Sequence, residues 1–583
     1  PPRAPDPRPL ARSPRDPYPH RHARQPPLDF YVVVRTERDT EALLWSLILD
    51  GAASLSALNG QFAFVFYDTK ERVAVVARDR MGEKPLYYWH SDASFVIASE
   101  LKPVLYWLRR IGIEPEIDRD ALRHYFAFNY VPLENTLVRN VKCLTPGHYI
   151  VLSGESFEMR GYWTPATPEL AVSESGRAEQ FAELLSDATR IRLRSDVPLG
   201  VFLSGGIDSA AVLTGAAQHD TDLRAYTVDF RPASFSEVSR AKVVTEALGI
   251  EHKILALDLE REDLTQLLPK LVYHADEPLA DSSALAVYLL CRNAREHITV
   301  ALSGDGGDEL FAGYNTNRAT LAARSIPSFV RGLVAPLSRF VRPWVSDANK
   351  VGSMEVLERF LRNLDLPPGA AHFAWNGMFR RKEQQCLLAS GLARSNDADS
   401  FCEIAAALGV DLQAPVLTQL LLADQANYLC NDILAKVDRM SMAHGLEVRS
   451  VLMDHRLVEF SRALLALNLI APRNGKRYLE SVLRSHVSSY PPSYRKQGFS
   501  IPVHGWMRGQ LREFVGDLLH SDVVERCGWF EPRYVRELWE QHQSGCRSIG
   551  FELWGVMVSL LWYQGVFAVD SGLSQDKDFS ADC

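Results

Sequence analysis

Strands and helices alternate between residues 178 and 304, and this alternation limits the possible folds more than any other feature of the sequence. Mostly apolar runs predict strands at 198–204, 224–230, 252–257 and 298–304. Helical patterns cover 178–194, 236–249 and 282–296, and a further helix begins near Ser209. Alternation at this spacing predicts an α/β domain with a parallel, doubly wound sheet. Beyond about residue 316, Trp, Leu and Phe recur at helical spacing, which predicts a mainly helical C-terminal region.

The preceding part of the chain has a different pattern, in which short strands follow one another with few helices. Strand-like runs lie at 30–34, 62–68, 72–79, 85–90 and 94–100, and a helical run at 39–51 ends at Gly51. This pattern predicts an α+β domain with an antiparallel sheet over 28–163. The segment 164–176 has the composition of a linker, and the α/β domain follows over 177–566.

The two ends of the chain are predicted to lie outside these domains. Residues 1–27 contain ten prolines and six arginines, so little of this stretch can form a helix or be buried, and we expect a disordered tail. Residues 567–583 are expected to form a flexible tail. The chain begins with Pro1 rather than Met, from which we expect a fragment, a processed product or a mis-joined reading frame.

Composition excludes several classes of protein. The 583 residues are 46% hydrophobic and 23% charged, which is typical of a globular protein, and no apolar run approaches the roughly 18 residues of a membrane span. The formal net charge of -8 gives no reason to expect a nucleic-acid partner. The eight cysteines form no C-x-x-C pair, and no signal peptide is visible, so we expect a cytoplasmic protein without a metal–thiolate site.

Two loops rich in glycine and aspartate follow predicted strands. Ser204–Ser209 reads SGGIDS and opens a helix, where free backbone N–H groups and the helix N-terminus favour a pyrophosphate. It lacks the G-K-[ST] of a Walker A loop, and an acid at Asp208 is explained if Mg²⁺ bridges it to phosphates. Ser303–Glu309 reads SGDGGDE after a later strand. Ligands bind at the carboxyl ends of parallel strands, so both loops are predicted to meet at one nucleotide.

The segments VFLSGGIDSAAVL and ALSGDGGDELFAGY resemble motifs of the asparagine synthetase family of ATP-pyrophosphatase amidotransferases. Three further segments are similar to signatures of that family: DEPLADSSA (276–284), KVDRMSMAHGLEVRSVLMDHRLVEF (436–460) and YRKQGFSIPVHGWMRG (494–509). The five motifs stand in the family's order and the resemblance covers roughly 28–566. It implies a partial glutaminase-type αββα domain, then an ATP-pyrophosphatase domain, and often a homodimer.

In that family, aspartate and ATP form β-aspartyl-AMP and pyrophosphate, and ammonia then attacks to give asparagine. The resemblance assigns the pyrophosphate loop to Ser204, Gly205, Gly206, Asp208 and Ser209. It assigns contacts with the adenine nucleotide to Leu203, Val228, Ser303 and Gly304. Asp208 and Asp308 are the implied Mg²⁺ ligands, and Asp305 stands where the family has an acid that is important for forming the acyl-adenylate.

A basic residue near the leaving pyrophosphate is also expected. Lys496 matches the family's R-x-K-Q-G-F segment, and an ammonium there stabilises negative charge that builds up in the adenylation transition state. Arg439, Glu447 and Arg449 are candidates for binding the amino-acid substrate. A structural ion-pair network is the alternative for these three residues.

The N-terminal part departs from the family's pattern. RTERDTE (35–41) resembles the segment whose acid binds the α-amino group of glutamine, so Asp39 takes that role. The family's N-terminal cysteine nucleophile is missing, as are its upstream arginine segment and its Asn-Gly-Glu motif, and residues 1–142 contain no cysteine. We therefore expect a truncated glutaminase that hydrolyses no glutamine, beside a synthetase that uses ammonia.

Two alternatives stay open on the sequence. One is an amide-forming enzyme of the same superfamily that acts on another carboxylate, as β-lactam synthetases and lasso-peptide cyclases do. The second is a non-catalytic remnant, against which the presence of Asp208, Asp305, Asp308 and Lys496 argues.

Overall fold

The computed structural model describes residues 39–92, 94–154, 156–166, 168–231, 237–341, 353–393, 397–491 and 501–568. The chain divides into two compact units. The smaller contains Pro1–Leu86 and Leu144–Pro165, and the larger contains Tyr87–Cys143 and Ala166–Cys583. The predicted tail at 1–27, the strand at 30–34 and residues 569–583 of the predicted C-terminal tail lie outside the described residues.

The smaller unit is built on an antiparallel sheet of four strands in the order β1-β2-β6-β7. Its strands are β1 (Ala63–Asp68), β2 (Val73–Arg78), β6 (His148–Ser153) and β7 (Ser156–Gly161). The described part of this unit begins with helix α1 (Asp39–Asp50), which is followed by a 3₁₀ turn at Gly51–Ala57. Leu55 and Val75 belong to its small apolar core. The predicted helix at 39–51 and the strands at 62–68 and 72–79 are confirmed.

A buried carboxylate shapes the loop after β2. Asp79 accepts hydrogen bonds from the backbone N–H groups of Met81, Glu83 and Lys84 at 2.9–3.1 Å. Burial raises the pKa of Asp79, although these hydrogen bonds and the Arg78 charge oppose the change. The single carboxylate of Asp79 therefore fixes the conformation of the loop at 78–84 by accepting hydrogen bonds from several backbone N–H groups.

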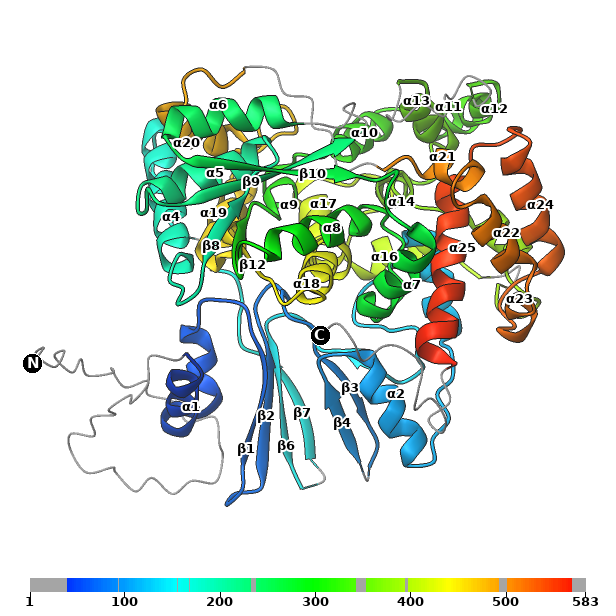
Figure 1. Ribbon diagram of the computed structural model, residues 1–583, viewed down its shortest axis with the longest axis horizontal. Helices are drawn as coiled ribbons and strands as arrows, with labels where there is room; N and C mark the ends of the chain where they lie inside the picture. The colour runs from blue at the N-terminus through cyan, green and yellow to red at the C-terminus, as the bar shows by residue number, and fades with distance from the viewer. Residues whose placement is uncertain are drawn as a thin grey trace, which may run out of the picture. The chain divides into compact units, whose positions relative to one another are not determined.

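The larger unit contains a parallel sheet of five strands in the order β10-β9-β8-β11-β12 (Figure 1). These are β8 (Leu199–Phe202), β9 (Arg224–Arg231), β10 (Glu251–Asp258), β11 (Val300–Ser303) and β12 (Glu447–Ser450). The four predicted strands are confirmed. The fifth strand, β12, was not predicted and comes from a distant part of the chain.

Helices connect and flank these strands. They include α4 (Glu174–Arg192), α5 (Ile207–Ala217), α6 (Val238–Leu248), α7 (Leu264–Ala275) and α8 (Ser283–Arg295). Successive connections run from β8 toward one edge, and the chain then crosses back from β10 to β11 on the other side of β8. Helical connections between parallel strands are right-handed. The change in direction after β10 therefore places later helices on the opposite face of the sheet from the earlier ones.

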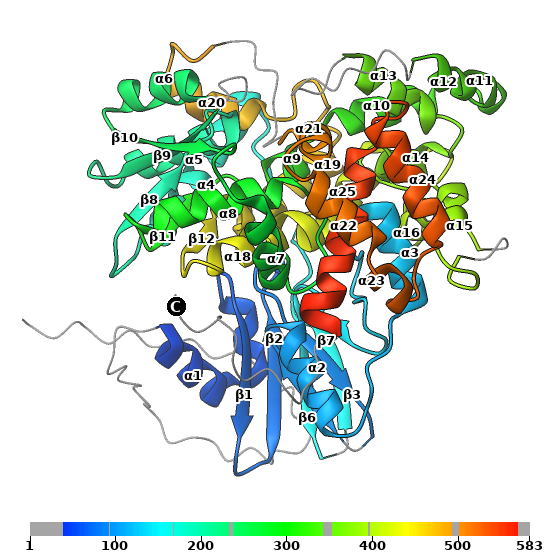
Figure 2. The same ribbon diagram turned by 45° about the vertical axis from the view of Figure 1, so that its right-hand side comes forward.

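The C-terminal part of the larger unit is mainly helical, as predicted (Figure 2). Its helices between β11 and β12 are α9 (Gly307–Phe311), α10 (Asn315–Arg324), α11 (Ser328–Val334), α12 (Ser338–Val341), α13 (Ser353–Arg362), α14 (Pro368–Ala374), α15 (Arg381–Leu387), α16 (Ser400–Ala407), α17 (Leu417–Asp424), a π-helix at Gln425–Leu434 and α18 (Ala435–Met442). After β12 come α19 (His455–Ala466), α20 (Arg477–His486), α21 (Val503–Arg508), α22 (Arg512–His520), α23 (Val523–Arg526), α24 (Pro532–Gln543), α25 (Gly550–Trp562) and a π-helix at Tyr563–Phe567.

Residues Tyr87–Cys143 form part of the larger unit's core. They contain a three-stranded antiparallel sheet, β4 (Phe95–Ala98), β3 (Tyr87–His90) and β5 (Lys142–Cys143), with helices α2 (Leu101–Arg110) and α3 (Arg119–Phe128). The strands predicted at 85–90 and 94–100 are thus confirmed. The domain boundaries expected at 28–163, 164–176 and 177–566 stay predictions, since the smaller compact unit contains only part of the first range.

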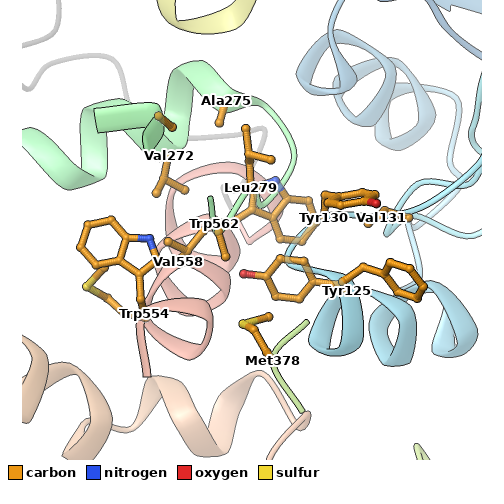
Figure 3. Packing of buried hydrophobic residues seen from close by; sticks show 14 of the residues in the cluster. Tyr125, Tyr130, Val131, Val272, Ala275, Leu279, Met378, Trp554, Val558 and Trp562 are labelled. Atoms are coloured by element: carbon orange, nitrogen blue, oxygen red, sulfur yellow. The ribbon is translucent and has the colours of Figure 1, made fainter. Parts of the chain in front are cut away.

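Aromatic side chains dominate the packing of this inserted segment. Figure 3 shows Tyr125, Tyr130, Trp554 and Trp562 with apolar neighbours from the same buried cluster. Tyr125 and Trp562 are completely buried. Because their polar atoms leave water, each needs a hydrogen-bond partner: the Tyr125 hydroxyl donates to the Gly555 carbonyl at 2.8 Å, and the Trp562 indole donates to the Asp276 carbonyl at 2.7 Å. None of the described helices is both long and apolar enough to cross a membrane.

Candidate functional site

The first loop predicted to bind phosphate connects β8 to α5. Leu203 donates from its backbone N–H to the Tyr226 carbonyl at 2.9 Å, which continues the sheet for one residue. The backbone N–H of Ser204 then donates to Ser209 Oγ at 3.2 Å, and the N–H of Gly206 donates to Ser204 Oγ at 3.3 Å. The two hydroxyls therefore hold the loop in shape at the N-terminus of α5, where the helix dipole favours an anion.

The second loop follows β11 and packs directly on the first. β11 pairs in parallel with β8, so the carboxyl ends of both strands lie at the same edge of the sheet. A Cβ atom on Gly304 would come within 2.7 Å of the Ser209 backbone nitrogen, and one on Gly307 would come within 2.6 Å of Asp208 Cγ. Only glycine permits this approach. The predicted meeting of the two loops is seen in the structure.

A lysine that the sequence did not single out lies between the two predicted metal ligands. Lys476 Nζ is 2.6 Å from Asp208 Oδ2 and 2.5 Å from Asp308 Oδ1. The Lys476 and Asp208 side chains are each 16% exposed, and that of Asp308 is 4% exposed. Gly475 precedes Lys476, and a Cβ atom there would overlap the Phe311 carbonyl oxygen at 1.8 Å. The glycine before the lysine was the only local signal in the sequence.

The residues at this edge fit a magnesium–nucleotide complex. Asp208 Oδ1 and Ser303 Oγ are buried and make no hydrogen bond to the described part of the chain, so each has capacity for a ligand. Within the described ranges, no group of three or more His, Cys, Asp or Glu side chains is arranged to hold a metal by itself. In nucleotide sites, the protein usually supplies one or two carboxylates to Mg²⁺, and the phosphate oxygens of the nucleotide complete the coordination.

Leu203 and Val228, the predicted nucleotide contacts outside the loops, are both buried: Leu203 directly follows β8, and Val228 lies within β9. The Leu203 carbonyl accepts a hydrogen bond of 2.7 Å from the Thr227 hydroxyl, next to Val228. The geometry brings these two residues to the same edge of the sheet as Ser204 and Ser303.

A second charged group lies next to Asp305. Lys436 Nζ is 2.5 Å from Asp281 Oδ2 and 3.6 Å from Asp432 Oδ1. Burial opposes the charged form of Lys436, but the negative charges of Asp281, Asp432 and Asp305 outweigh it and raise the lysine's pKa. Burial, together with the charge of Asp281, raises the pKa of Asp432 well above its usual value.

Asp281 and Asp432 also line a cavity of about 300 Å³. Tyr428 and Asp432 reach it from the π-helix at Gln425–Leu434, and Trp375 lines it as well. Asp432 is 2% exposed and Trp375 is 6% exposed. Among the described atoms, Trp375 Nε1 has no hydrogen-bond partner, whereas Asp432 Oδ1 pairs with Lys436 Nζ at 3.6 Å. A buried donor without a partner in the cavity is suited to a polar ligand.

The three predicted substrate-binding residues make structural contacts. Arg439 is buried and donates to the Ser99 carbonyl at 2.8 Å and to Asp276 Oδ2 at 3.3 Å. Glu447 and Arg449 form a 2.6 Å ion pair on β12, and Arg449 also donates to the carbonyls of Arg192 and Arg194. These contacts match the alternative of an ion-pair network, and the substrate-binding role stays a prediction.

The roles of two further predicted residues are not tested by this arrangement. Asp39 is an exposed residue at the start of α1 in the smaller unit, where its carboxylate accepts a 3.3 Å hydrogen bond from the Thr40 hydroxyl. Lys496 lies outside the described residues. Their roles stay predictions.

A parallel sheet with two glycine- and aspartate-rich loops at the carboxyl ends of adjacent strands defines a nucleotide-binding α/β domain. Residues 180–564 match the model of the asparagine synthase family, and residues 18–163 match that of the glutamine amidotransferase domain. The chain therefore belongs to the asparagine synthase family and is an ATP-dependent carbon–nitrogen ligase.

Its relatives match most of its length. Asparagine synthetase [glutamine-hydrolyzing] 1 of Bacillus subtilis (strain 168) is 28% identical over 542 residues, which cover 91% of this chain and 81% of the relative. A putative asparagine synthetase [glutamine-hydrolyzing] of Mycobacterium tuberculosis (strain ATCC 25618 / H37Rv) is 30% identical over 550 residues, covering 91% of this chain and 80% of the relative.

Proposed function

We propose that this protein amidates L-aspartate to L-asparagine. ATP first adenylates the side-chain carboxylate and releases pyrophosphate, and ammonia then displaces AMP from the acyl-adenylate. The observation that carries the proposal is the convergence of Asp208 and Asp308 on one cation position at the ends of β8 and β11. Two carboxylates that share one cation position can hold the Mg²⁺ that accompanies a pyrophosphate leaving group.

Each loop has a part in this proposal. Ser204, Gly205, Gly206, Asp208 and Ser209 hold the pyrophosphate, and the N-terminus of α5 adds positive potential. Leu203, Val228, Ser303 and Gly304 contact the nucleotide, and Ser303 Oγ has the unused hydrogen-bonding capacity for it. Mg²⁺ held by Asp208 and Asp308 would neutralise negative charge on the departing pyrophosphate.

The reacting carboxylate is proposed to bind beside Asp305. Asp305 and Lys436 interact electrostatically, and Lys436 contacts Asp281 on the wall of the 300 Å³ cavity. Lys496 is proposed to stabilise negative charge that develops on the phosphates during adenylation. Arg439, Glu447 and Arg449 are proposed to support the substrate pocket.

Ammonia is proposed as the nitrogen source of this chain. Residues 1–142 contain no cysteine, so this region supplies no thiol nucleophile for glutamine hydrolysis. Asp39 keeps its proposed role in binding the amino group of glutamine. The glutaminase-type αββα arrangement and a homodimer remain proposals from the family resemblance.

The size of the cavity also favours a second class of carboxylate substrate. Its volume of about 300 Å³ reaches the range of pockets that take ligands larger than a single small amino acid. Trp375 Nε1, a buried donor without a partner among the described atoms, provides hydrogen-bonding capacity beyond the reacting end of the substrate. A polar carboxylate that is larger than aspartate is therefore the alternative substrate.

Pyrophosphate release tests the aspartate assignment and the nitrogen source. Protein is mixed with ATP, Mg²⁺ and L-aspartate, with ammonia or glutamine, and the product is identified by mass. Asparagine with ammonia and none with glutamine supports the proposal in full. Asparagine with glutamine overturns the ammonia-only part. Pyrophosphate release that does not depend on aspartate, or no release from folded protein, overturns the aspartate assignment.

A further inference from the structure

Lys476 bridges two acids that belong to different loops. Asp208 lies in the first turn of α5 and Asp308 lies in the first turn of α9, and both carboxylates contact the same Lys476 nitrogen. All three side chains are at most 16% exposed. The contacts therefore differ from a surface ion pair, which water screens to a small net effect.

The loop backbone packs closely against these side chains. Gly307 packs against Asp208, where a Cβ atom would lie 2.6 Å from the carboxylate carbon. Gly313 packs against Asp308 and Lys476 together, since a Cβ atom there would lie 1.7 Å from Asp308 Oδ1 and 2.5 Å from Lys476 Cε. Two carboxylates held this close repel each other unless a cation lies between them.

We propose that Lys476 is a resident cation that takes the place of Mg²⁺ between Asp208 and Asp308 until the magnesium–nucleotide complex binds. The inference rests on the proposed metal role of the two acids. The ammonium and Mg²⁺ compete for the same oxygens, and two cations cannot share them without repulsion. Lys476 therefore leaves the acids when the metal arrives, and its charge becomes available to phosphate oxygens near the loop.

Thermal unfolding in EDTA, without nucleotide or substrate, tests the resident-cation role. Lys476→Met removes the charge and keeps most of the side-chain volume. We expect its unfolding midpoint to fall below that of the wild type in EDTA and to recover when Mg²⁺ is added. Lys270→Met, at an exposed position on α7, is the matched control and should behave as the wild type does.

Titration with Mg²⁺ alone by calorimetry tests the competition. Removing the competing ammonium should strengthen Mg²⁺ binding by about tenfold or more, because a nearby like charge has been removed. Lys476→Arg keeps the charge and should retain both the wild-type midpoint in EDTA and weak Mg²⁺ binding. These readouts need no substrate, so they hold whether or not aspartate is the carboxylate.

A double variant keeps the test decisive if Lys476→Met folds poorly. Lys476→Met combined with Asp308→Asn removes one negative charge together with the cation, and it should recover stability in EDTA relative to Lys476→Met. Recovery supports the proposal. The proposal is overturned if Lys476→Met matches Lys270→Met in EDTA, if Mg²⁺ binds it no more tightly than the wild type, or if Asp308→Asn adds to its instability.

Discussion

The hydroxyl of Tyr125 lies 2.8 Å from the carbonyl oxygen of Gly555 and donates a hydrogen bond to it. This contact joins α3, in the inserted segment Tyr87–Cys143, to α25 near the end of the described chain. Both partners are buried, and Tyr125 is fully removed from water. The bond therefore couples two parts of the larger unit that are 430 residues apart in the sequence.

Tyr125→Phe should destabilise the larger unit by about 1 kcal/mol, because the Gly555 carbonyl loses its donor while the aromatic packing is kept. Thermal unfolding monitored by near-ultraviolet circular dichroism measures the change. Tyr106→Phe, at a position that is 47% exposed, is the control and should have no measurable effect. Equal midpoints for the two variants would contradict the expectation.

Gly304→Ala should disrupt the nucleotide site. The added Cβ atom would meet backbone atoms of Asp208 and Ser209 at 2.7–3.0 Å, and backbone atoms cannot swing aside as a flexible side chain can. The loops would have to separate, so binding of ATP should weaken by about tenfold or more. Equilibrium dialysis with labelled ATP measures the dissociation constant of each variant. Gly332→Ala has no neighbouring atom within 4 Å of the new Cβ and should bind ATP normally.

Asp208→Asn should reduce aspartate-dependent pyrophosphate release by about a hundredfold or more, because the amide cannot neutralise a metal ion at the phosphates. The substitution also removes the charge that pairs Lys476 with Asp208, so that of these two ion pairs only the one with Asp308 is left. Asp517→Asn makes the same substitution at an exposed position of α22 and serves as the control. Undiminished release from Asp208→Asn would rule out its proposed role.

Glu277 should make stability depend on pH. Burial raises the pKa of Glu277 from 4.5 to about 8; the hydrogen bond from the Leu137 N–H opposes this change and the charge of Asp276 adds to it. Between these values the native state holds a proton that the unfolded chain has lost. More protons bound by the native state means that stability falls as pH rises through this window.

Glu277→Gln cannot ionise and keeps the oxygen that accepts from Leu137 at 3.0 Å. Its unfolding midpoint should therefore fall less than that of the wild type between about pH 5.5 and pH 7.5. Glu260→Gln, at an exposed position, should retain the wild-type slope. Identical slopes for the wild type and Glu277→Gln would show that Glu277 ionises normally in the native state.

The order of strands and helices was predictable where the pattern was long and regular. The strands β8, β9, β10 and β11 are apolar runs between turns, and the two loops after β8 and β11 carry distinctive residues. The strand β12 was not predicted because it is short. Its four residues, Glu447–Ser450, alternate between partly exposed and buried positions, and four residues are too few to show a periodic pattern.

Long-range pairing accounts for the other differences. The strand β3 was predicted, but its partner β5 lies about fifty residues further along and contains only Lys142 and Cys143. Lys476 was missed because it lies more than 160 residues from either loop, and the preceding Gly475 alone does not indicate a site. Its importance comes from the tertiary contacts that bring α20 next to α5.

The position of β12 also has a consequence for synthesis of the chain on the ribosome. β11 ends at Ser303, and its outer neighbour begins at Glu447, so the edge of β11 stays open while the intervening residues are made. An open edge of a buried sheet offers its unpaired backbone groups to other chains. A nascent chain that stops within this interval would therefore be prone to aggregate, and productive folding of the sheet must wait until β12 has emerged.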